Sequence, residues 1–327
     1  MDECCVDLIF ADPPYFLSNG GITCRAGRMV SVYKGAWDQS RGAGADHQFN
    51  RRWLAACRRV LRPDGAIWVS GTSHVIHSVG FAMQQLGFKL LNDVTWVKPN
   101  PPPNLSCRYF THATETIVWA AKCHRSRHVF NYALMKDMAG GKQMKSVWSI
   151  SPAGRKEKSL GSYPTQKPLA LLERVLLATS NPGDTVLDPF MGSGTTLVAA
   201  QGLLRRAIGV ELEAPSVALA LARLCSDAVS ATLAVSTSEM NLDGGRGSVD
   251  RSVRRPGRNS GMQIQARLVR RECSFYFVGN ERREVVYSAV AENFEDAWQK
   301  FRDSAAAGIP VLFVIKTETE IYLTLGT

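Results

Sequence analysis

The 327-residue sequence predicts a doubly wound α/β fold with a mostly parallel sheet. Short apolar runs alternate with amphipathic helical stretches, which is typical of strand–helix–strand units. Two of these runs end in loops rich in proline or glycine, and ligands bind at such loops in open parallel sheets. The apolar content of 45% and charged content of 21% are ordinary for a globular protein, and the length allows one large domain and a smaller one.

The first half of the chain predicts three strands and two helices. Residues 6–11 are an apolar run that stops at two prolines, so this strand leads into a rigid loop. Helical periodicity then predicts helices over 49–61 and 74–86, and apolar runs predict strands over 66–70 and 88–97. Turn residues at 62–65 separate the first of these helices from the first of these strands.

A basic segment that we expect to be irregular follows, over residues 98–160. It holds 11 lysines and arginines against three acidic residues, and this surplus of 8 is most of the net charge of +10. Such a surplus indicates either a solvated basic surface or a face that binds phosphates.

The second half of the chain repeats the alternation of helix and strand. Residues 167–180 predict a helix with Pro168 in its first turn. The sequence then predicts a strand over 185–188, a helix over 192–201 and a strand over 206–211. Beyond these, 236–262 is a linker rich in Gly, Arg and Ser, and 263–327 predicts a small α+β unit, with its helix over 293–306.

The loop after the strand at 185–188 carries two glycines, Gly192 and Gly194, and opens a helix. Glycine lets the backbone approach a ligand, and a helix N-terminus offers free N–H groups to an anion. The loop lacks the lysine of a P-loop and the spacing of the dinucleotide fingerprint. Glu211 ends the next strand, where an acid can accept hydrogen bonds from ribose hydroxyls. The alternative is a glycine turn that binds nothing.

The run Asp12-Pro13-Pro14-Tyr15 follows the first strand. Its prolines fix the backbone, so the Asp12 carboxylate and the Pro13 carbonyl can accept the two hydrogens of an amino group. An aromatic amine is a poor nucleophile because its lone pair is delocalised. Two acceptors favour a pyramidal nitrogen and offset the positive charge of the transition state. Tyr15 supplies a face on which a base can stack. The alternative is a strand-ending turn without function.

These loops resemble motifs of the S-adenosylmethionine-dependent DNA amino-methyltransferases. Residues 12–15 resemble the catalytic motif, 188–195 the cofactor motif, and 163–168 the segment before it. The catalytic loop comes first, which resembles the circularly permuted β-type arrangement with its target-recognition region between the two motifs. The resemblance covers roughly residues 6 to 225.

The resemblance implies a class I methyltransferase that methylates adenine N6 of a base flipped out of duplex DNA. Aspartate at position 12 favours adenine in this type, and cytosine N4 is the alternative. The implied catalytic residues are Asp12, Pro13, Pro14 and Tyr15. The implied cofactor contacts are Asp188 (amino group), Glu211 (ribose), Thr165 and Lys167 (methionine end), Pro189, Phe190, Gly192, Gly194 and Thr195. The implied DNA contacts are Lys98, Arg108, Lys122, Arg125, Arg127, Lys142 and Lys145.

We therefore expect a methyltransferase domain over 1–235 with a recognition insert at about 98–160, followed by the linker and the α+β unit. Relatives of the permuted type carry a further strand and helix before the catalytic strand, whereas eleven residues precede Asp12 here. Either the start has been lost or another segment fills the sheet edge beside Glu211, and 231–236 is the candidate strand. The main alternative is an inactive relative that binds only DNA, and a second is an RNA or protein amino-methyltransferase.

Several further expectations concern surroundings and partners. The cysteines and histidines at 107–128 match no zinc-ligand spacing, so no metal site is predicted. Scattered cysteines, no signal peptide and no long apolar run indicate a cytoplasmic protein without a membrane span. The expected partners are double-stranded DNA and a separately encoded restriction endonuclease, and a homodimer stays open. The tryptophans at 96, 119 and 148 should lie in the core, whereas Trp37-Asp38 either borders the site or packs.

Overall fold

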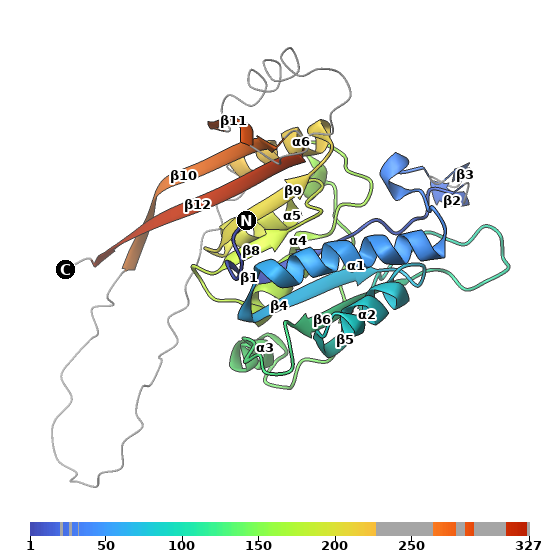
Figure 1. Ribbon diagram of the computed structural model, residues 1–327, viewed down its shortest axis with the longest axis horizontal. Coiled ribbons are helices and arrows are strands. Elements are labelled where there is room, and N and C mark those ends of the chain that lie inside the picture. The colour runs from blue at the N-terminus through green and yellow to red at the C-terminus, as the bar shows by residue number, and fades with distance from the viewer. Residues whose placement is uncertain are drawn as a thin grey trace, which may run out of the picture.

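The computed structural model describes residues 1–19, 22–25, 28–31, 33–226, 264–278, 285–290 and 312–325. Its strands form one mixed ten-stranded sheet in the order β11-β10-β12-β9-β8-β1-β4-β6-β5-β7, and β2 and β3 form a separate hairpin (Figure 1). The strands are β1 (Val6–Ala11), β2 (Ile22–Arg25), β3 (Arg28–Ser31), β4 (Leu61–Gly71), β5 (Lys89–Val97), β6 (Thr114–Ala121), β7 (Val147–Ser149), β8 (Thr185–Asp188), β9 (Arg206–Glu211), β10 (Ile264–Val278), β11 (Val285–Val290) and β12 (Leu312–Leu325). The helices are α1 (Ala43–Val60), α2 (Ile76–Gln85), α3 (Tyr132–Met138), α4 (Leu169–Thr179), α5 (Thr195–Gly202) and α6 (Ala214–Cys225), with short 3₁₀ turns at Ala36–Asp38 and Lys156–Lys158.

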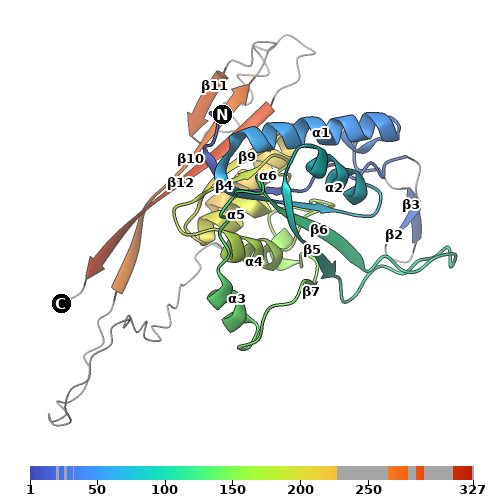
Figure 2. The ribbon, with the colours of Figure 1, turned by 60° about the horizontal axis from the view of Figure 1, so that its bottom comes forward.

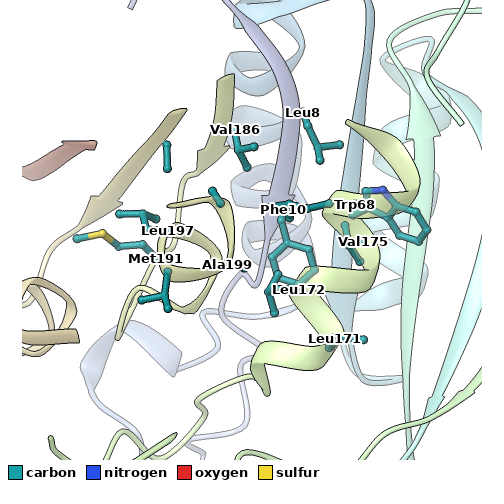
Figure 3. Close-up of a cluster of buried hydrophobic side chains, with 14 of the residues drawn as sticks. Leu8, Phe10, Trp68, Leu171, Leu172, Val175, Val186, Met191, Leu197 and Ala199 are labelled. Carbon is teal, nitrogen blue, oxygen red and sulfur yellow. The ribbon is translucent and has the colours of Figure 1, made fainter. Parts of the chain in front are cut away.

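Helices cover both faces of this sheet, as Figure 2 shows. Successive strand side chains point to opposite faces, so Leu8 and Phe10 pack with α4, α5 and α6, whereas Ile9 and Ala11 pack with α1 and α2. Figure 3 shows the first cluster, in which Phe10 lies against α4. The predicted α/β class is thereby confirmed, and the sheet is mixed, because β6 and β12 pair antiparallel to β4 and β9.

Four central strands run in the same direction. β1 pairs in parallel with β4 and β8, and β8 pairs in parallel with β9. Their carboxyl ends therefore meet at one edge of the sheet, which we call the active-site edge. Both loops singled out in the sequence begin there, because Asp12 follows β1 and Asp188 ends β8.

Element boundaries agree closely where the apolar pattern is strong. The strands predicted at 6–11, 185–188 and 206–211 are confirmed. β4 begins earlier than predicted, but its register with β1 jumps from Val6↔Leu61 to Leu8↔Ala66, so residues 62–65 bulge out. The helix predicted from 192 begins only at Thr195, because the glycines before it adopt positive φ.

The prediction that 98–160 is irregular is wrong over 114–121. These residues form the buried strand β6, which lies between β4 and β5, and α3 and β7 follow it. The apolar run from Ile117 to Ala121 carries the strand signal, which the surrounding basic residues obscured. The three tryptophans expected in the core are buried, and Trp68 stacks on Trp119 with ring centroids 5.0 Å apart.

The sheet edge beside Glu211 is occupied by β12, which pairs antiparallel to β9 with Phe313 opposite Glu211. The candidate strand at 231–236, the linker at 236–262 and the helix predicted at 293–306 lie outside the described residues. Among the helices that the structure describes, none is long and apolar enough to cross a bilayer.

Candidate active site

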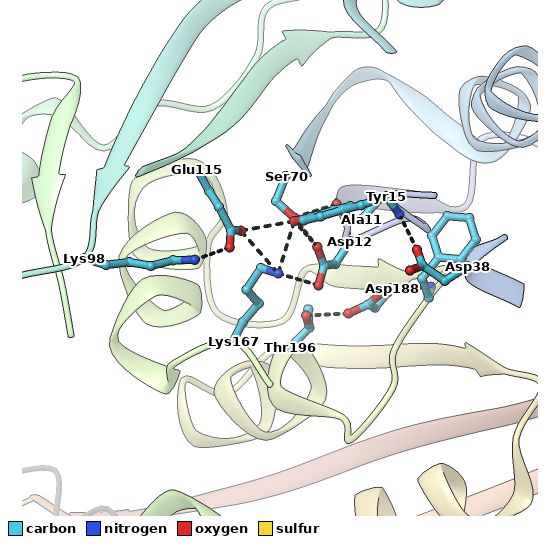
Figure 4. A network of polar contacts seen from close by, with 11 residues as sticks. Ala11, Asp12, Tyr15, Asp38, Ser70, Lys98, Glu115, Lys167, Asp188 and Thr196 are labelled. Carbon is cyan, nitrogen blue, oxygen red and sulfur yellow. Dashed lines mark hydrogen bonds and ion pairs between the residues drawn. The ribbon is translucent and has the colours of Figure 1, made fainter. Parts of the chain in front are cut away.

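The Asp12 carboxylate lies at the centre of a polar network at the active-site edge (Figure 4). One of its oxygens, Oδ1, accepts hydrogen bonds from Ser70 Oγ at 2.6 Å and Tyr15 Oη at 2.7 Å. The other, Oδ2, accepts from Lys167 Nζ at 2.6 Å. Ser70 stands on β4 and Lys167 precedes α4, so three segments hold the carboxylate in one orientation.

Glu115 on β6 extends this network. Its Oε2 lies 3.1 Å from Tyr15 Oη, whose one proton is shared between Glu115 and Asp12, and 3.5 Å from Lys167 Nζ. Its Oε1 accepts from Lys98 Nζ at 2.5 Å. Two carboxylates and two ammonium groups thus balance each other in a largely buried site. A buried charge requires such pairing, because an unpaired buried charge lowers the stability of the fold. Removing one partner of a buried ion pair destabilises a protein by roughly 3–5 kcal/mol.

The pKa values of the network follow from its charges. Burial alone would raise the pKa of Glu115, but Lys167 and Lys98 outweigh it and lower that pKa to about 2. Burial would lower the pKa of Lys167, but Asp12 and Glu115 outweigh it and raise it above its ordinary value. Burial, together with the charges of Asp12 and Glu115, raises the pKa of Tyr15 well above its usual value, so its hydroxyl stays protonated and can donate.

The loop after Asp12 is shaped by Asp38, which is fully buried. Its carboxylate accepts hydrogen bonds from the backbone N–H groups of Tyr15 at 3.0 Å, Phe16 at 2.8 Å and Leu17 at 3.2 Å. Phe16 adopts φ 58, an uncommon conformation that this carboxylate stabilises. Trp37 and Asp38 both line the cavity described below, so this pair borders the site, and Asp38 is packed there as well.

Asp188 anchors the glycine loop. Its buried carboxylate accepts hydrogen bonds from Thr196 Oγ1 at 2.5 Å and the Phe190 N–H at 3.0 Å. Burial raises the pKa of Asp188 to about 7 in spite of these bonds. A carboxyl group that titrates near neutrality at the end of a parallel strand is suited to meet a cationic group of a ligand.

Gly192 has positive φ and leaves room that a larger residue would fill. A Cβ atom there would lie 2.9 Å from the Tyr163 ring. Its N–H donates to Glu211 Oε2 at 2.8 Å, so the acid predicted to bind ribose also orders the glycine loop. Burial raises the pKa of Glu211.

One cavity of 870 Å³ joins the two loops. Its walls include the run 12–15, the segment 165–167 and the residues from 188 to 193. Glu211 and Asp188 place acidic groups in it, and Phe190 and Met191 supply apolar surface. S-adenosylmethionine carries a sulfonium, an ammonium and a ribose, and these acids, this apolar wall and the backbone left open by Gly192 fit such a molecule.

The structure brings most of the predicted catalytic and cofactor residues together, with three differences in their placement. Tyr15 is only 7% exposed, and the ammonium groups of Lys34 and Lys167 lie over its ring, 5.3 and 5.2 Å from the centroid, so the ring has no free face for a base. Gly194 does not line the cavity: it adopts φ 75 and packs against Ala220, where a Cβ would come within 2.8 Å. Lys167, expected near the methionine end, binds the Asp12 carboxylate.

The predicted DNA contacts are spread over both edges of the sheet. Arg108 is exposed in the loop at the active-site edge, and Lys98 at its base binds Glu115. Lys122, Arg125 and Arg127 follow the end of β6 at the opposite edge, where Lys122 Nζ donates to the Leu61 carbonyl at 2.5 Å. The remaining two, Lys142 and Lys145, are exposed between α3 and β7. In the described residues no cluster of His, Cys, Asp and Glu could hold a metal ion.

Sequence reasoning missed Ser70 and Glu115. Ser70 stands near the carboxyl end of a buried strand beside β1, which is a position typical of site residues in parallel sheets. Glu115 is a single acid at the start of an apolar run, and such an acid needs a partner when buried. The first signal is useful only once β4 is known to lie beside β1, and the second only once β6 is known to lie beside β4.

Comparison with known proteins agrees with this geometry. The family model described as DNA methylase matches residues 6–221. The chain is 54% identical over 220 residues to the Type II methyltransferase M2.DpnII of Streptococcus pneumoniae, a match that covers 67% of this chain and 82% of the relative. It is 50% identical over 208 residues to the Type II methyltransferase M2.MboI of Moraxella bovis, a match that covers 64% of this chain and 76% of the relative.

Solved structures show the same fold. The complex of M1.HpyAVI with S-adenosylmethionine superposes with a TM-score of 0.52 at 29% identity, covering 68% of this chain and 90% of that one. The cytosine-N4-specific PvuII DNA methyltransferase matches with a TM-score of 0.54 at 20% identity, which covers 69% of this chain and 82% of that one and shows the fold alone. The predicted family is therefore confirmed: the chain belongs to the DNA methylases and is an S-adenosylmethionine-dependent DNA methyltransferase.

Proposed function

We propose that the protein methylates adenine N6 at a specific site in double-stranded DNA and thereby protects that site from a separately encoded restriction endonuclease. The observation that carries the proposal is the single cavity shared by the Asp12 carboxylate and the glycine loop at 188–193. The Type II names of the relatives support the restriction–modification role. Aspartate at position 12 favours adenine over cytosine N4, which is the second candidate.

The chain's own residues would hold the reactants in place. S-adenosylmethionine supplies an electrophilic methyl group when it is bound. Asp188, Glu211 and the backbone at Gly192 would hold it, and Thr165, Thr195, Pro189 and Phe190 line the same cavity. The carboxylate of Asp12 and the carbonyl of Pro13 would accept the two amino hydrogens of the target base, with Pro14 fixing the loop.

The target amino group must displace a donor that Asp12 already holds. Both Asp12 oxygens are engaged, by Ser70 and Tyr15 on one side and by Lys167 on the other. Tyr15 and Ser70 are the neutral donors, so the departure of either costs less than that of Lys167. Tyr15 has the nearer alternative acceptor, Glu115 Oε2 at 3.1 Å, whereas that of Ser70 is the Ala11 carbonyl at 3.5 Å. We infer that Tyr15 moves when the base enters, and that its ring is then free to stack on the base.

Product analysis tests the proposed function. Methyl transfer to plasmid DNA, followed by nucleoside digestion and mass spectrometry, should yield N6-methyladenine, and sequencing should map it to one short motif. Exclusive N4-methylcytosine, or methylation of RNA without methylation of duplex DNA, would overturn the proposal.

Glu115 is proposed as a positioning residue. Glu115→Gln removes the charge that holds Lys167 and Lys98, so both ammonium groups shift toward Asp12 and compete with the amino group. We expect kcat to fall about ten- to a hundredfold, with cofactor affinity changed less than about twofold. Steady-state kinetics with calorimetry measure both. The control is Arg62→Met, which removes an exposed ion pair with Asp7 and should keep kcat. An unchanged kcat in Glu115→Gln would reject this role.

Cofactor affinity should depend on pH through Asp188. Its pKa of about 7 means that it is ionised above neutrality and protonated below, and only the ionised form attracts a cation. Affinity should therefore weaken about tenfold from pH 8 to pH 6. Calorimetric titration of Asp188→Asn should show weaker binding without this slope. Equal affinity of the wild type at both pH values would contradict the assignment.

The DNA-binding face is proposed for the active-site edge, where Arg108 is exposed, with Lys142 and Lys145 as further contacts. The positions of Lys122, Arg125 and Arg127 at the opposite edge favour a solvated surface for these three.

The division of the chain into domains is also a proposal. It consists of a doubly wound, mostly parallel methyltransferase domain over 1–235 with a recognition insert, a linker over 236–262 and a C-terminal α+β unit. A cytoplasmic location and a homodimer are further proposals.

A further inference from the structure

The loop between β5 and β6, residues 99–113, rises from the active-site edge. Gly71, at the carboxyl end of β4, pairs with Thr116, and Val97 pairs with Thr114. The Lys98 N–H donates to the Ala113 carbonyl at 2.8 Å and closes the base of the loop. Figures 1 and 2 both show the loop extending beyond the sheet on the side of the β2–β3 hairpin. The loop thus shares its edge with Asp12.

The tip of this loop presents an aromatic side chain to water. Phe110 is 94% exposed, the highest value among the large apolar side chains in the described part of the chain. The loop is nevertheless held in shape: Asn104 Nδ2 donates to the Tyr109 carbonyl at 2.6 Å, and Asn104 Oδ1 accepts from the Ser106 N–H at 3.0 Å. Prolines at 99 and 101–103 limit the backbone further. The same loop also exposes Leu105 (42%) and Tyr109 (57%), and a loop held in shape that groups three large apolar side chains in water indicates a contact surface.

The charge of the loop selects the partner. Residues 98–114 contain no Asp or Glu, whereas Arg108 is exposed two residues before Phe110. An exposed arginine beside apolar side chains matches the chemistry of a duplex, whose phosphates are anionic and whose bases present apolar faces. The edge that carries the loop also holds the site where the target base must arrive.

We propose that Phe110 inserts into the DNA at the step from which the target base leaves, while Arg108 binds a neighbouring phosphate. This inference rests on the proposed function. Extruding a base leaves a gap in the stack, and an aromatic ring in that gap restores part of the lost stacking. Phe110 would then lower the cost of base extrusion, and the chemical step at Asp12 would not depend on it.

The test compares two DNAs and four proteins. One DNA is a paired duplex carrying the mapped methylation site, and the other has the target adenine opposite an abasic position, so that extrusion costs little. Phe110→Ala should lower kcat/KM on the paired duplex about tenfold to a hundredfold and on the abasic duplex less than about threefold. Phe110→Trp should retain activity on both. The control is Phe130→Ala, which removes a phenylalanine 46% exposed near the opposite edge of the sheet.

Base extrusion is then followed directly with 2-aminopurine at the target position, whose fluorescence rises when it leaves the stack. The wild type and Phe130→Ala should produce this rise, and Phe110→Ala should lose most of it. Equal losses of kcat/KM on both DNAs, or no loss on either, would overturn the inference. Failure of the wild type to methylate adenine would instead reject the proposed function, so the two failures are distinguishable.

Discussion

Replacing Asp12 with alanine should reduce methyl transfer to DNA by about a thousandfold or more, because this carboxylate is the proposed acceptor for the target amino group. Asp12→Asn keeps one acceptor oxygen but loses the ion pair with Lys167, so its activity should lie between that of alanine and the wild type. Single-turnover transfer of a tritiated methyl group measures the chemical step in each variant.

Binding of S-adenosylmethionine should survive these changes. Its proposed contacts are on the glycine loop and Glu211, so calorimetry should give affinities within about threefold of the wild type. Asp46→Asn, which changes another acid lining the same cavity, is the matched control and should keep methyl transfer. A methyl-transfer rate for Asp12→Ala within tenfold of the wild type would remove Asp12 from the chemistry.

Replacing Lys167 with methionine should destabilise the protein and impair methyl transfer together. The variant leaves the carboxylates of Asp12 and Glu115 in a largely buried site with one cation fewer, and breaking a buried ion pair costs roughly 3–5 kcal/mol. Urea denaturation at pH 7 measures this loss. The double variant Lys167→Met with Glu115→Gln should recover part of it, because one unpaired charge is removed.

The pH dependence of stability provides an independent check on the same network. The folded-state pKa of Glu115, about 2, lies below its ordinary value of 4.5, so its contribution is fully present above 4.5 and is lost as pH falls toward 2. This slope should be shallower in Lys167→Met. Wild-type stability and pH slope in that variant would contradict the ion-pair network.

The parts of the fold that the sequence predicted are those with strong local signals. Residues 6–11 are mostly apolar, 185–188 place Val186 and Leu187 between turn residues, and both segments end at proline or glycine loops, so each strand and its adjacent loop could be recognised without knowing any neighbour. Asp12 and Gly192 were predicted for the same reason, because proline and glycine restrict what their loops can do. Since ligands bind at the carboxyl ends of strands in open parallel sheets, the two loops could also be expected to face one site.

The remaining features depend on contacts between distant segments. β6 was missed because its apolar run lies within a basic stretch, and its place between β4 and β5 is fixed by pairing that no local pattern encodes. Ser70 and Glu115 reach Asp12 only through that pairing. Tyr15 was expected to offer its ring, and its inward position depends on Ser70, Glu115 and Asp12 together.

A structure of the full chain with a duplex containing the mapped site and a non-reactive analogue of S-adenosylmethionine tests the central claim most directly. We expect the adenine N6 nitrogen within about 3.2 Å of an Asp12 oxygen, on a line toward the analogue in the cavity beside Gly192. Tyr15 should have left Asp12. An extruded adenine held elsewhere, with Asp12 still bound to Tyr15 and Lys167, would contradict the assignment of Asp12 as the group that receives the amino hydrogens.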